Sequence, residues 1–151
     1  MRVSSALNVA ARYSISSAPH TSSTIVSKSV ARGGGRTSYR GLVQVDEGAY
    51  GSKSTVKCDA LLVDTISRSD TYPYVDVRED DVQMGHEATV SKVSAYQLFY
   101  LMSRGMSELD AKKLMIEAQF APAAAKIPDP ELRDAISEYV KERLNAIEPV
   151  S

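Results

Sequence analysis

The sequence has a single cysteine, only two histidines and no apolar run that approaches the length needed to cross a bilayer. One cysteine cannot form an internal disulfide, which agrees with a reducing compartment and leaves Cys58 free either for chemistry or for burial. The lack of a long apolar run excludes a membrane-spanning helix. We therefore expect a cytoplasmic protein with no membrane partner.

Acidic residues are missing from residues 1–45, which carry six basic residues. Residues 46–151 hold 12 basic and 19 acidic residues, so the net charge is −1. The early basic charges are scattered among Ser and Gly without interleaved aromatics, which disfavours a nucleic-acid partner. The first residues, "MRVSSALNVAARY", also lack the apolar region and cleavage signal of a secreted protein. The length of 151 residues suits a single domain of ordinary globular composition.

Residues 1–93 are rich in Ser, Thr, Val and Gly and contain short apolar runs about every 14 to 18 residues. Turn signals separate the runs, among them "GGG" at 33–35, "EGAYG" at 47–51 and "REDD" at 78–81. We interpret this spacing as one short strand per repeat unit. The pattern fits a β-meander or sandwich and equally a β-solenoid, and periodicity does not decide between them.

From residue 94 the pattern changes to helices. Ser94 and Gln97 form a capping box that opens a helix over residues 95–104, and Gly105 suits its C-terminus. Ser107 opens a second helix that we expect to end near residue 120, where "APAAAKIP" follows. A third helix begins at Pro130, capped by Asp129. Its apolar positions are expected on one face: Leu132, Ile136, Tyr139, Val140 and Ile147.

Two glycine-rich stretches, "RGGGR" at 32–36 and "GAYGSKST" at 48–55, have a superficial likeness to phosphate-binding loops. In the second, Ser52 interrupts the Gly-Lys-Ser/Thr succession that a P-loop requires, and neither stretch lies between a strand and an amphipathic helix. Both are interpreted as turns between strands. The acidic run at 79–81 lacks the spaced oxygen ligands of a calcium loop and is interpreted as a solvated turn.

Cys58 and the adjacent pair His86 and Glu87 are the candidate functional residues. In "TVKCDALLV", strand alternation places Cys58 on one face with apolar neighbours and Lys57 on the other. Such a cysteine is either inert filling or a thiolate source. His86 and Glu87 point to opposite faces of a regular strand unless Gly85 introduces a bulge that re-aims one of them.

Four runs carry a family resemblance: "APHTSSTIVSKSVARGGGRTSYRGLV", "CDALLVDTISRSDTYPYVDV", "GHEATVSK" and "QLFYLMSRGMSE". In unbroken order over residues 18–120 they resemble the C-terminal part of the SufB/SufD family, the scaffold subunits of the SUF iron-sulfur cluster assembly machinery. The "HEAT" form with Glu87 after His86 is similar to SufB, whereas SufD typically has glycine at the position of Glu87. Cys58 matches the SufB cysteine implicated in cluster formation.

The resemblance implies a mainly β fold with an α tail: the C-terminal portion of a right-handed parallel β-helix over residues 18–93 and a helical domain over 94–151. Residues 1–17 and the tail after Phe120 diverge from the family pattern, and the resemblance implies a C-terminal fragment or truncated product. The resemblance implies a scaffold and not an enzyme, with the ATPase activity in the partner SufC. It also implies a heterodimer with SufD through the β-helices and delivery of sulfur by donor proteins.

By the same resemblance the cofactor is a transient iron-sulfur cluster, with Cys58 as thiolate, Glu87 as assisting carboxylate and His86 as a further candidate ligand. The helix at 95–104 is expected to dock SufC through Tyr96, Phe99 and Tyr100, with Arg104 and Glu108 as a polar rim. The alternative to docking is that the two later helices cover the apolar surface of this helix completely. Two other functions are weighed: an adaptor that recruits SufC without assembling a cluster, and a hydrolase using His86 and Glu87, for which no serine motif or metal triad is present.

Overall fold

The computed structural model describes residues 5–10 and 13–145. The chain divides into two compact units, Met1–Ser91 and Lys92–Ser151, called here the β unit and the helical unit. No helix in these described ranges is both long and apolar enough to span a membrane.

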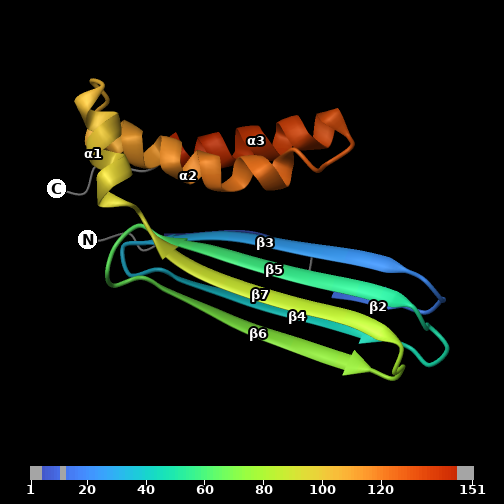
Figure 1. Cartoon of the computed structure of the whole chain (residues 1–151). Helices are drawn as coiled ribbons and strands as arrows, with labels where there is room; N and C mark the ends of the chain where they lie inside the picture. The colour runs from blue at the N-terminus through green and yellow to red at the C-terminus, as the bar shows by residue number, and fades with distance from the viewer. Residues whose placement is uncertain (1–4, 11–12, 146–151) are drawn as a thin grey trace. The chain divides into compact units, whose positions relative to one another are not determined.

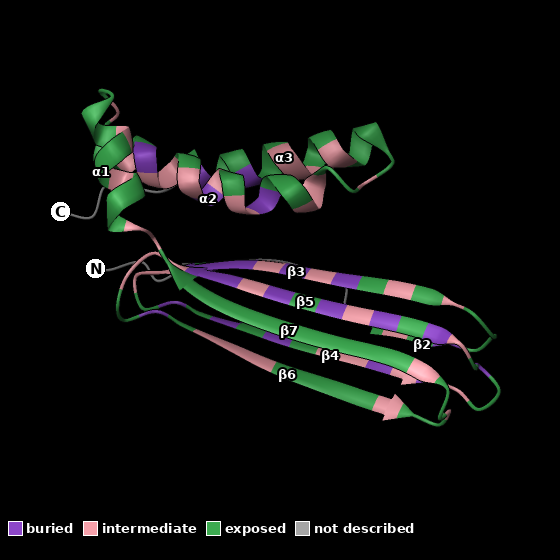
Figure 2. Ribbon diagram, viewed as in Figure 1, coloured by how far each residue is buried: buried purple, intermediate pink, exposed green. Residues whose placement is uncertain are grey.

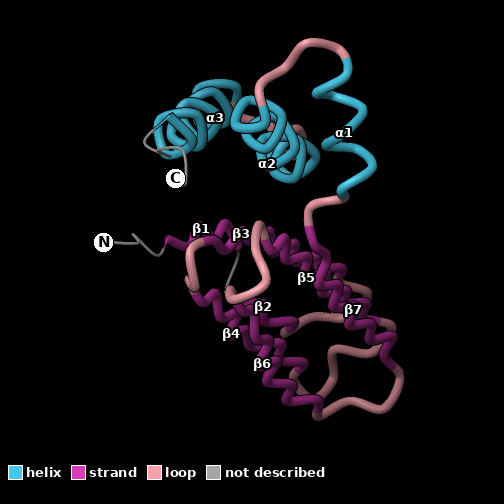
Figure 3. The backbone as a smooth tube through the Cα atoms, turned by 90° about the vertical axis from the view of Figure 1, so that its left-hand side faces the viewer, coloured by secondary structure: helices cyan, strands magenta, loops and turns pink. Residues whose placement is uncertain are grey.

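The β unit consists of two sheets whose strands follow one another alternately along the chain (Figures 1 and 3). One sheet has the order β1-β3-β5-β7 and the other the order β2-β4-β6. The pairs β3–β5, β2–β4 and β4–β6 are parallel, whereas β1 runs antiparallel to β3. The strands are β1 (Ser5–Ala10), β2 (Tyr13–Ser16), β3 (Ser22–Arg32), β4 (Arg36–Val45), β5 (Ser52–Leu62), β6 (Arg68–Val77) and β7 (Val82–Lys92).

The coil repeat is about twice the spacing of the apolar runs. Ser23 Oγ donates to Ser54 Oγ, 31 residues later, at 2.8 Å, and Thr37 Oγ1 donates to Ser69 Oγ, 32 residues later, at 2.9 Å. Each apolar run lies in its own strand, which confirms the interpretation of one strand per unit of 14 to 18 residues, and two successive strands make one coil with one strand in each sheet. The stacked, mostly parallel strands confirm the mainly β class and are consistent with a β-helix-like fold, which a meander of antiparallel neighbours is not.

The β-unit core lies between the two sheets, and the alternation along β5 shows how the sequence builds it. Val56, Cys58 and Ala60 are buried, whereas Lys57 is exposed (Figure 2). Period-two alternation places every second side chain inward, as expected for strands with one buried face. Ile25 on β3 and Tyr39 and Val43 on β4 complete a cluster with Val56 and Cys58, so both sheets contribute to one core.

The glycine-rich stretches form turns, as predicted. Gly33, Gly34, Gly48 and Gly51 all have positive φ, a region that glycine enters without a Cβ clash. The acidic run at 79–81 contacts the second of these turns, because the backbone N–H of Gly48 donates to the Glu79 carboxylate at 3.0 Å. These stretches therefore connect strands.

The helical unit contains α1 (Ala95–Ser103), α2 (Glu108–Ala124) and α3 (Pro130–Asn145). The expected caps are present: the Gln97 N–H donates to Ser94 Oγ at 3.3 Å, and the Leu132 N–H donates to Asp129 Oδ1 at 3.2 Å. Gly105 has φ of 93°, the left-handed geometry expected after a helix end. Start signals in the sequence therefore located all three helices.

The predicted end of the second helix was wrong. The second helix continues through Pro122 to Ala124, because proline removes one backbone hydrogen bond while the surrounding alanines favour helix. In α3 the expected apolar face is only partly buried: Val140 is buried, but Leu132 and Tyr139 are 52% and 45% exposed. Ile147 lies outside the described residues, and the buried Leu144 was not predicted.

Candidate functional site

Cys58 lies on the inward face of β5 and is only 5% exposed. It packs in the same core cluster as Tyr39 on the facing sheet and Val56 on its own strand. Burial, and secondarily the Asp59 carboxylate, raise the pKa of the Cys58 thiol to about 11. At neutral pH the side chain is therefore a protonated thiol, and thiolate chemistry requires a metal ion or another cation to displace the proton.

Lys57 does not assist the thiol, because it projects from the opposite face of β5. Its ammonium lies 3.3 Å from the Glu87 carboxylate, and both side chains are more than half exposed. An exposed ion pair of this kind contributes little to stability. Glu87 is thereby assigned to the outer face of the sheet, away from the side of β5 that carries Cys58.

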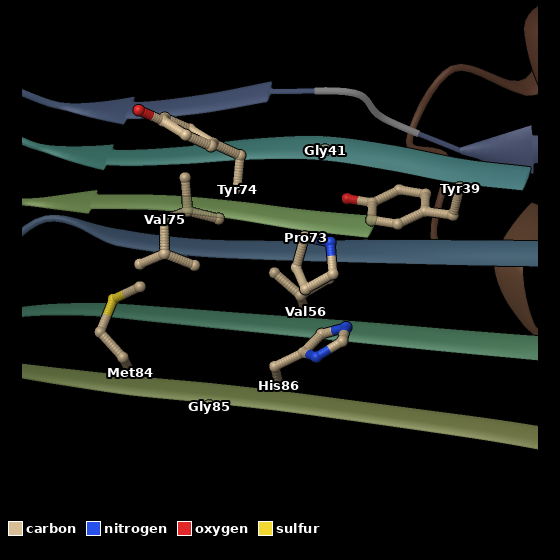
Figure 4. Close-up of a pocket in the computed structure, with 10 residues that line it drawn as sticks. Tyr39, Gly41, Val56, Pro73, Tyr74, Val75, Met84, Gly85 and His86 are labelled. Atoms are coloured by element: carbon tan, nitrogen blue, oxygen red, sulfur yellow. The ribbon is translucent and has the colours of Figure 1, made fainter. Parts of the chain in front are cut away.

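His86 has the opposite orientation from Glu87. Strand β7 is continuous from Val82 to Lys92 across Gly85, and adjacent side chains of a strand alternate between its faces. His86 lines a cavity between the two sheets, where Figure 4 shows it near Val56 and Met84. The structure thus brings His86 and Cys58 to the inner side, where both neighbour Val56, and leaves Glu87 outside.

The cavity has a volume of about 210 Å³ and draws its lining from β4, β5, β6 and β7. Most of its wall is apolar; the principal side chains are Tyr39, Val56, Pro73, Val75, Met84 and His86 (Figure 4). Tyr39 contributes a phenol, and burial, followed by the nearby Cys58, raises its pKa, so the phenol is protonated at neutral pH. Sequence reasoning missed Met84, and it missed Tyr39 although the alternation of Tyr39 with exposed neighbours along β4 marks it as inward-facing.

The cavity lies toward the free edges of the two sheets. Strands β6 and β7 end their respective sheets, and Figure 2 shows both largely exposed. Four of their apolar side chains remain at least one-third exposed: Val75 at 51%, Val77 at 40%, Met84 at 38% and Val90 at 55%. An apolar strand pattern with this much exposure is typical of a surface that another polypeptide covers.

Within the described part of the chain, no three His, Cys, Asp or Glu side chains are grouped so that they could hold a metal ion. On the inner side the chain offers the Cys58 thiol and the His86 imidazole, which are suitable soft and borderline donors. Iron-sulfur clusters usually take four protein ligands. The donors fit a cluster in kind and are too few to enclose one.

A second candidate surface is formed by α1, which has no buried residue. Tyr96, Phe99 and Tyr100 are 79%, 72% and 50% exposed. The alternative that α2 and α3 cover this helix entirely does not hold. Arg104, expected on a polar rim, lies over the Tyr100 ring at 5.3 Å.

The stacked, mostly parallel strands and the buried cysteine define a β-helix-like core that carries a thiol inside it. Residues 10–119 match the family described as "SUF system FeS cluster assembly, SufBD core domain". The chain belongs to this SufBD family, as the resemblance predicted.

Curated relatives agree with this membership. An iron-sulfur cluster assembly SufBD family protein of Mycobacterium tuberculosis is 73% identical over 111 residues, which are 74% of this chain and 13% of the relative. A protein of the same description from Mycobacterium leprae has the same identity and coverage. The iron-sulfur cluster assembly protein SufB of Bacillus subtilis is 48% identical over 111 residues, 74% of this chain and 24% of that protein. The chain therefore spans about a quarter or less of the length of these relatives.

Proposed function

We propose that this chain is part of a SufB-like scaffold on which iron-sulfur clusters are assembled, and that Cys58 is its principal cluster ligand. The observation that carries the proposal is the position of Cys58 in the core beside a cavity at the free sheet edges, within a SufBD core match. The cluster is cargo that the scaffold builds and hands on. The chain itself acts as a scaffold and not as an enzyme.

The burial of Cys58 has a chemical consequence for this role. A thiol whose pKa is raised to about 11 is unreactive until a metal ion replaces its proton. Iron entering the cavity meets the His86 imidazole at its wall, and the Cys58 sulfur lies in the adjoining core beside Val56, which lines the cavity. A site with one thiolate and one imidazole holds a cluster less firmly than four thiolates do, which suits a transient cluster.

The missing ligands and the energy source are assigned to partners. The free edge formed by β6 and β7 supports a heterodimer with SufD, which would supply further ligands at the open side of the cavity. The exposed aromatic face of α1 supports docking of the ATPase SufC. Sulfur reaches the site from donor proteins, and the chain acts in the cytoplasm.

The test is anaerobic reconstitution with ferrous iron and sulfide, in the presence of SufC and SufD, followed by iron analysis and visible absorption. We expect Cys58→Ala to reduce cluster content to background while partner binding persists. His86→Ala and Glu87→Ala form a matched pair, since the two residues are adjacent and face opposite sides. Lys57→Ala is the control for loss of the outer ion pair. Full cluster content in Cys58→Ala would rule out the proposed role.

A second candidate function is an adaptor that recruits SufC and assembles no cluster. It is favoured by the exposed aromatics of α1 and by the absence of a grouped metal-ligand set in the described residues. Phe99→Ala should weaken SufC binding more than tenfold, as removal of an interface anchor does. Leu132→Ala on α3, which is also exposed, is the control. The adaptor is the better description if SufC binds and no iron is retained.

A further inference from the structure

The hydroxyl of Tyr39 has no hydrogen-bond partner although it is buried. Tyr39 lies on β4, faces the interior and is 5% exposed. Among the described residues, Tyr39 Oη is the single buried side-chain nitrogen or oxygen atom without a partner. Buried polar groups are nearly always hydrogen-bonded, because an unpaired one has lost its water and gained nothing. Packing alone does not account for this atom, since a phenylalanine ring would fill the same space.

The backbone beside this hydroxyl, at Gly41 on the same strand, leaves room for it. A Cβ at Gly41 would lie 2.1 Å from Tyr39 Oη, so any larger residue there would displace the phenol. Tyr39 and Gly41 both line the cavity between the sheets, and Figure 4 shows the hydroxyl directed along β4 toward Gly41 and Pro73. The Tyr39 hydroxyl thus lies at the cavity wall because Gly41 has no side chain that would displace it.

The ligand that this donor would meet is indicated by its neighbour. Tyr39 and Cys58 belong to the same core cluster, one from each sheet. A phenol is a donor at neutral pH, and sulfur that carries negative charge is an acceptor. Hydrogen bonds to the sulfurs of an iron-sulfur cluster are a principal determinant of its reduction potential.

We propose that Tyr39 is a positioning residue of the cluster-assembly site, and that its hydroxyl donates a hydrogen bond to sulfur held at Cys58. This assignment rests on the proposed function of Cys58. The unpartnered phenol is then a pre-oriented donor whose acceptor arrives with the cluster, as a sulfide of the cluster held at Cys58, because the Cys58 sulfur itself is not its partner.

The test is Tyr39→Phe in the full chain, which removes only the hydroxyl, compared with Tyr13→Phe, whose tyrosine is 72% exposed. Both variants are reconstituted anaerobically with ferrous iron and sulfide, beside wild type and Cys58→Ala. We expect Tyr39→Phe to unfold no more readily than wild type, because it removes an unpaired buried group. Its cluster should be lost to an iron chelator about tenfold faster, as expected for one hydrogen bond to a charged acceptor. Its reduction potential should move in the negative direction. Tyr13→Phe should match wild type in all three measurements.

The outcomes separate the two proposals. If Cys58→Ala loses the cluster but Tyr39→Phe keeps the wild-type cluster lifetime and reduction potential, the Tyr39 assignment alone is wrong. If Cys58→Ala retains a full cluster, or wild type acquires none, the proposed function is wrong and the Tyr39 assignment falls with it. A Tyr39→Phe chain that no longer folds would show that the hydroxyl serves the fold, which also overturns the assignment.

Discussion

Raising the pH from about 9 to about 11 should destabilise the β unit through the Cys58 thiol. In the folded chain burial raises the pKa of this thiol from 9.0 to about 11. Across this window the unfolded chain loses the thiol proton while the folded chain keeps it. The stability that comes from burying the neutral thiol is therefore fully present below pH 9 and lost as the pH rises toward 11.

The size of the effect follows from the shift. In the middle of the window the free energy of unfolding falls by about 1.4 kcal/mol per pH unit, which gives about 2 to 3 kcal/mol in total. This is a large part of the stability of a small unit. Because Cys58 is 5% exposed, solvent screening reduces this effect little.

The assay is urea denaturation at a series of pH values, followed through the methyl resonances of Ile25, Val43 and Val56, which report on the β unit. Wild type is compared with Cys58→Ala, since titration of the lysines and of the tyrosines other than Tyr39 affects both chains equally. The difference between the two unfolding free energies should be constant below pH 9 and change by about 2 to 3 kcal/mol by pH 11. Parallel pH curves for the two chains would refute the buried, neutral thiol.

Three further predictions concern single positions. At pH 8 about one Cys58 thiol in a thousand is ionised in the folded chain. Iodoacetamide should therefore label the folded chain at least a hundredfold more slowly than the urea-unfolded chain. Equal labelling rates would contradict the burial of Cys58. Gly51→Ala should destabilise the β unit by more than Gly48→Ala in denaturation experiments. Both glycines have positive φ, so either substitution costs about 1 to 2 kcal/mol through backbone strain, but only at Gly51 would the new Cβ lie 2.3 Å from His20. Equal losses of stability would contradict the contact with His20. Asp129→Ala should lower helical-unit stability by about 1 kcal/mol in thermal melts followed by circular dichroism, whereas Asp129→Asn should retain most of it.

Helix starts and strand faces could be predicted from the sequence because local chemistry determines both. Ser94 and Asp129 cap helices through side chains that reach backbone donors only a few residues away. The inward orientation of Cys58 followed from alternation alone. The end of α2 was not predictable in the same way. Pro122 disfavours helix, whereas the neighbouring alanines and the burial of Phe120 favour it, and the sequence alone does not show which effect is larger.

The cavity was beyond sequence reasoning because it depends on which strands face each other. Tyr39 and His86 are 47 positions apart in the numbering, and they meet only because β4 lies in one sheet and β7 in the other. The coil of two strands determines this pairing, and the spacing of apolar runs alone did not show that two successive strands make one coil. Alternation along β4 marks Tyr39 as inward-facing, but nothing local marked its hydroxyl as unpaired, since pairing depends on the whole surrounding core.

The opposite orientation of His86 and Glu87 constrains where a cluster can form. The His86 imidazole faces the cavity and Cys58 lies in the adjoining core, whereas Glu87 points outward toward Lys57. For Cys58 and Glu87 to serve one cluster, as the family resemblance implies, the backbone of β7 must shift or the cluster must sit around its free edge. That edge is also where apolar side chains remain uncovered. The same strand would then hold cluster ligands and meet a partner, so that partner binding and completion of the ligand set become a single event.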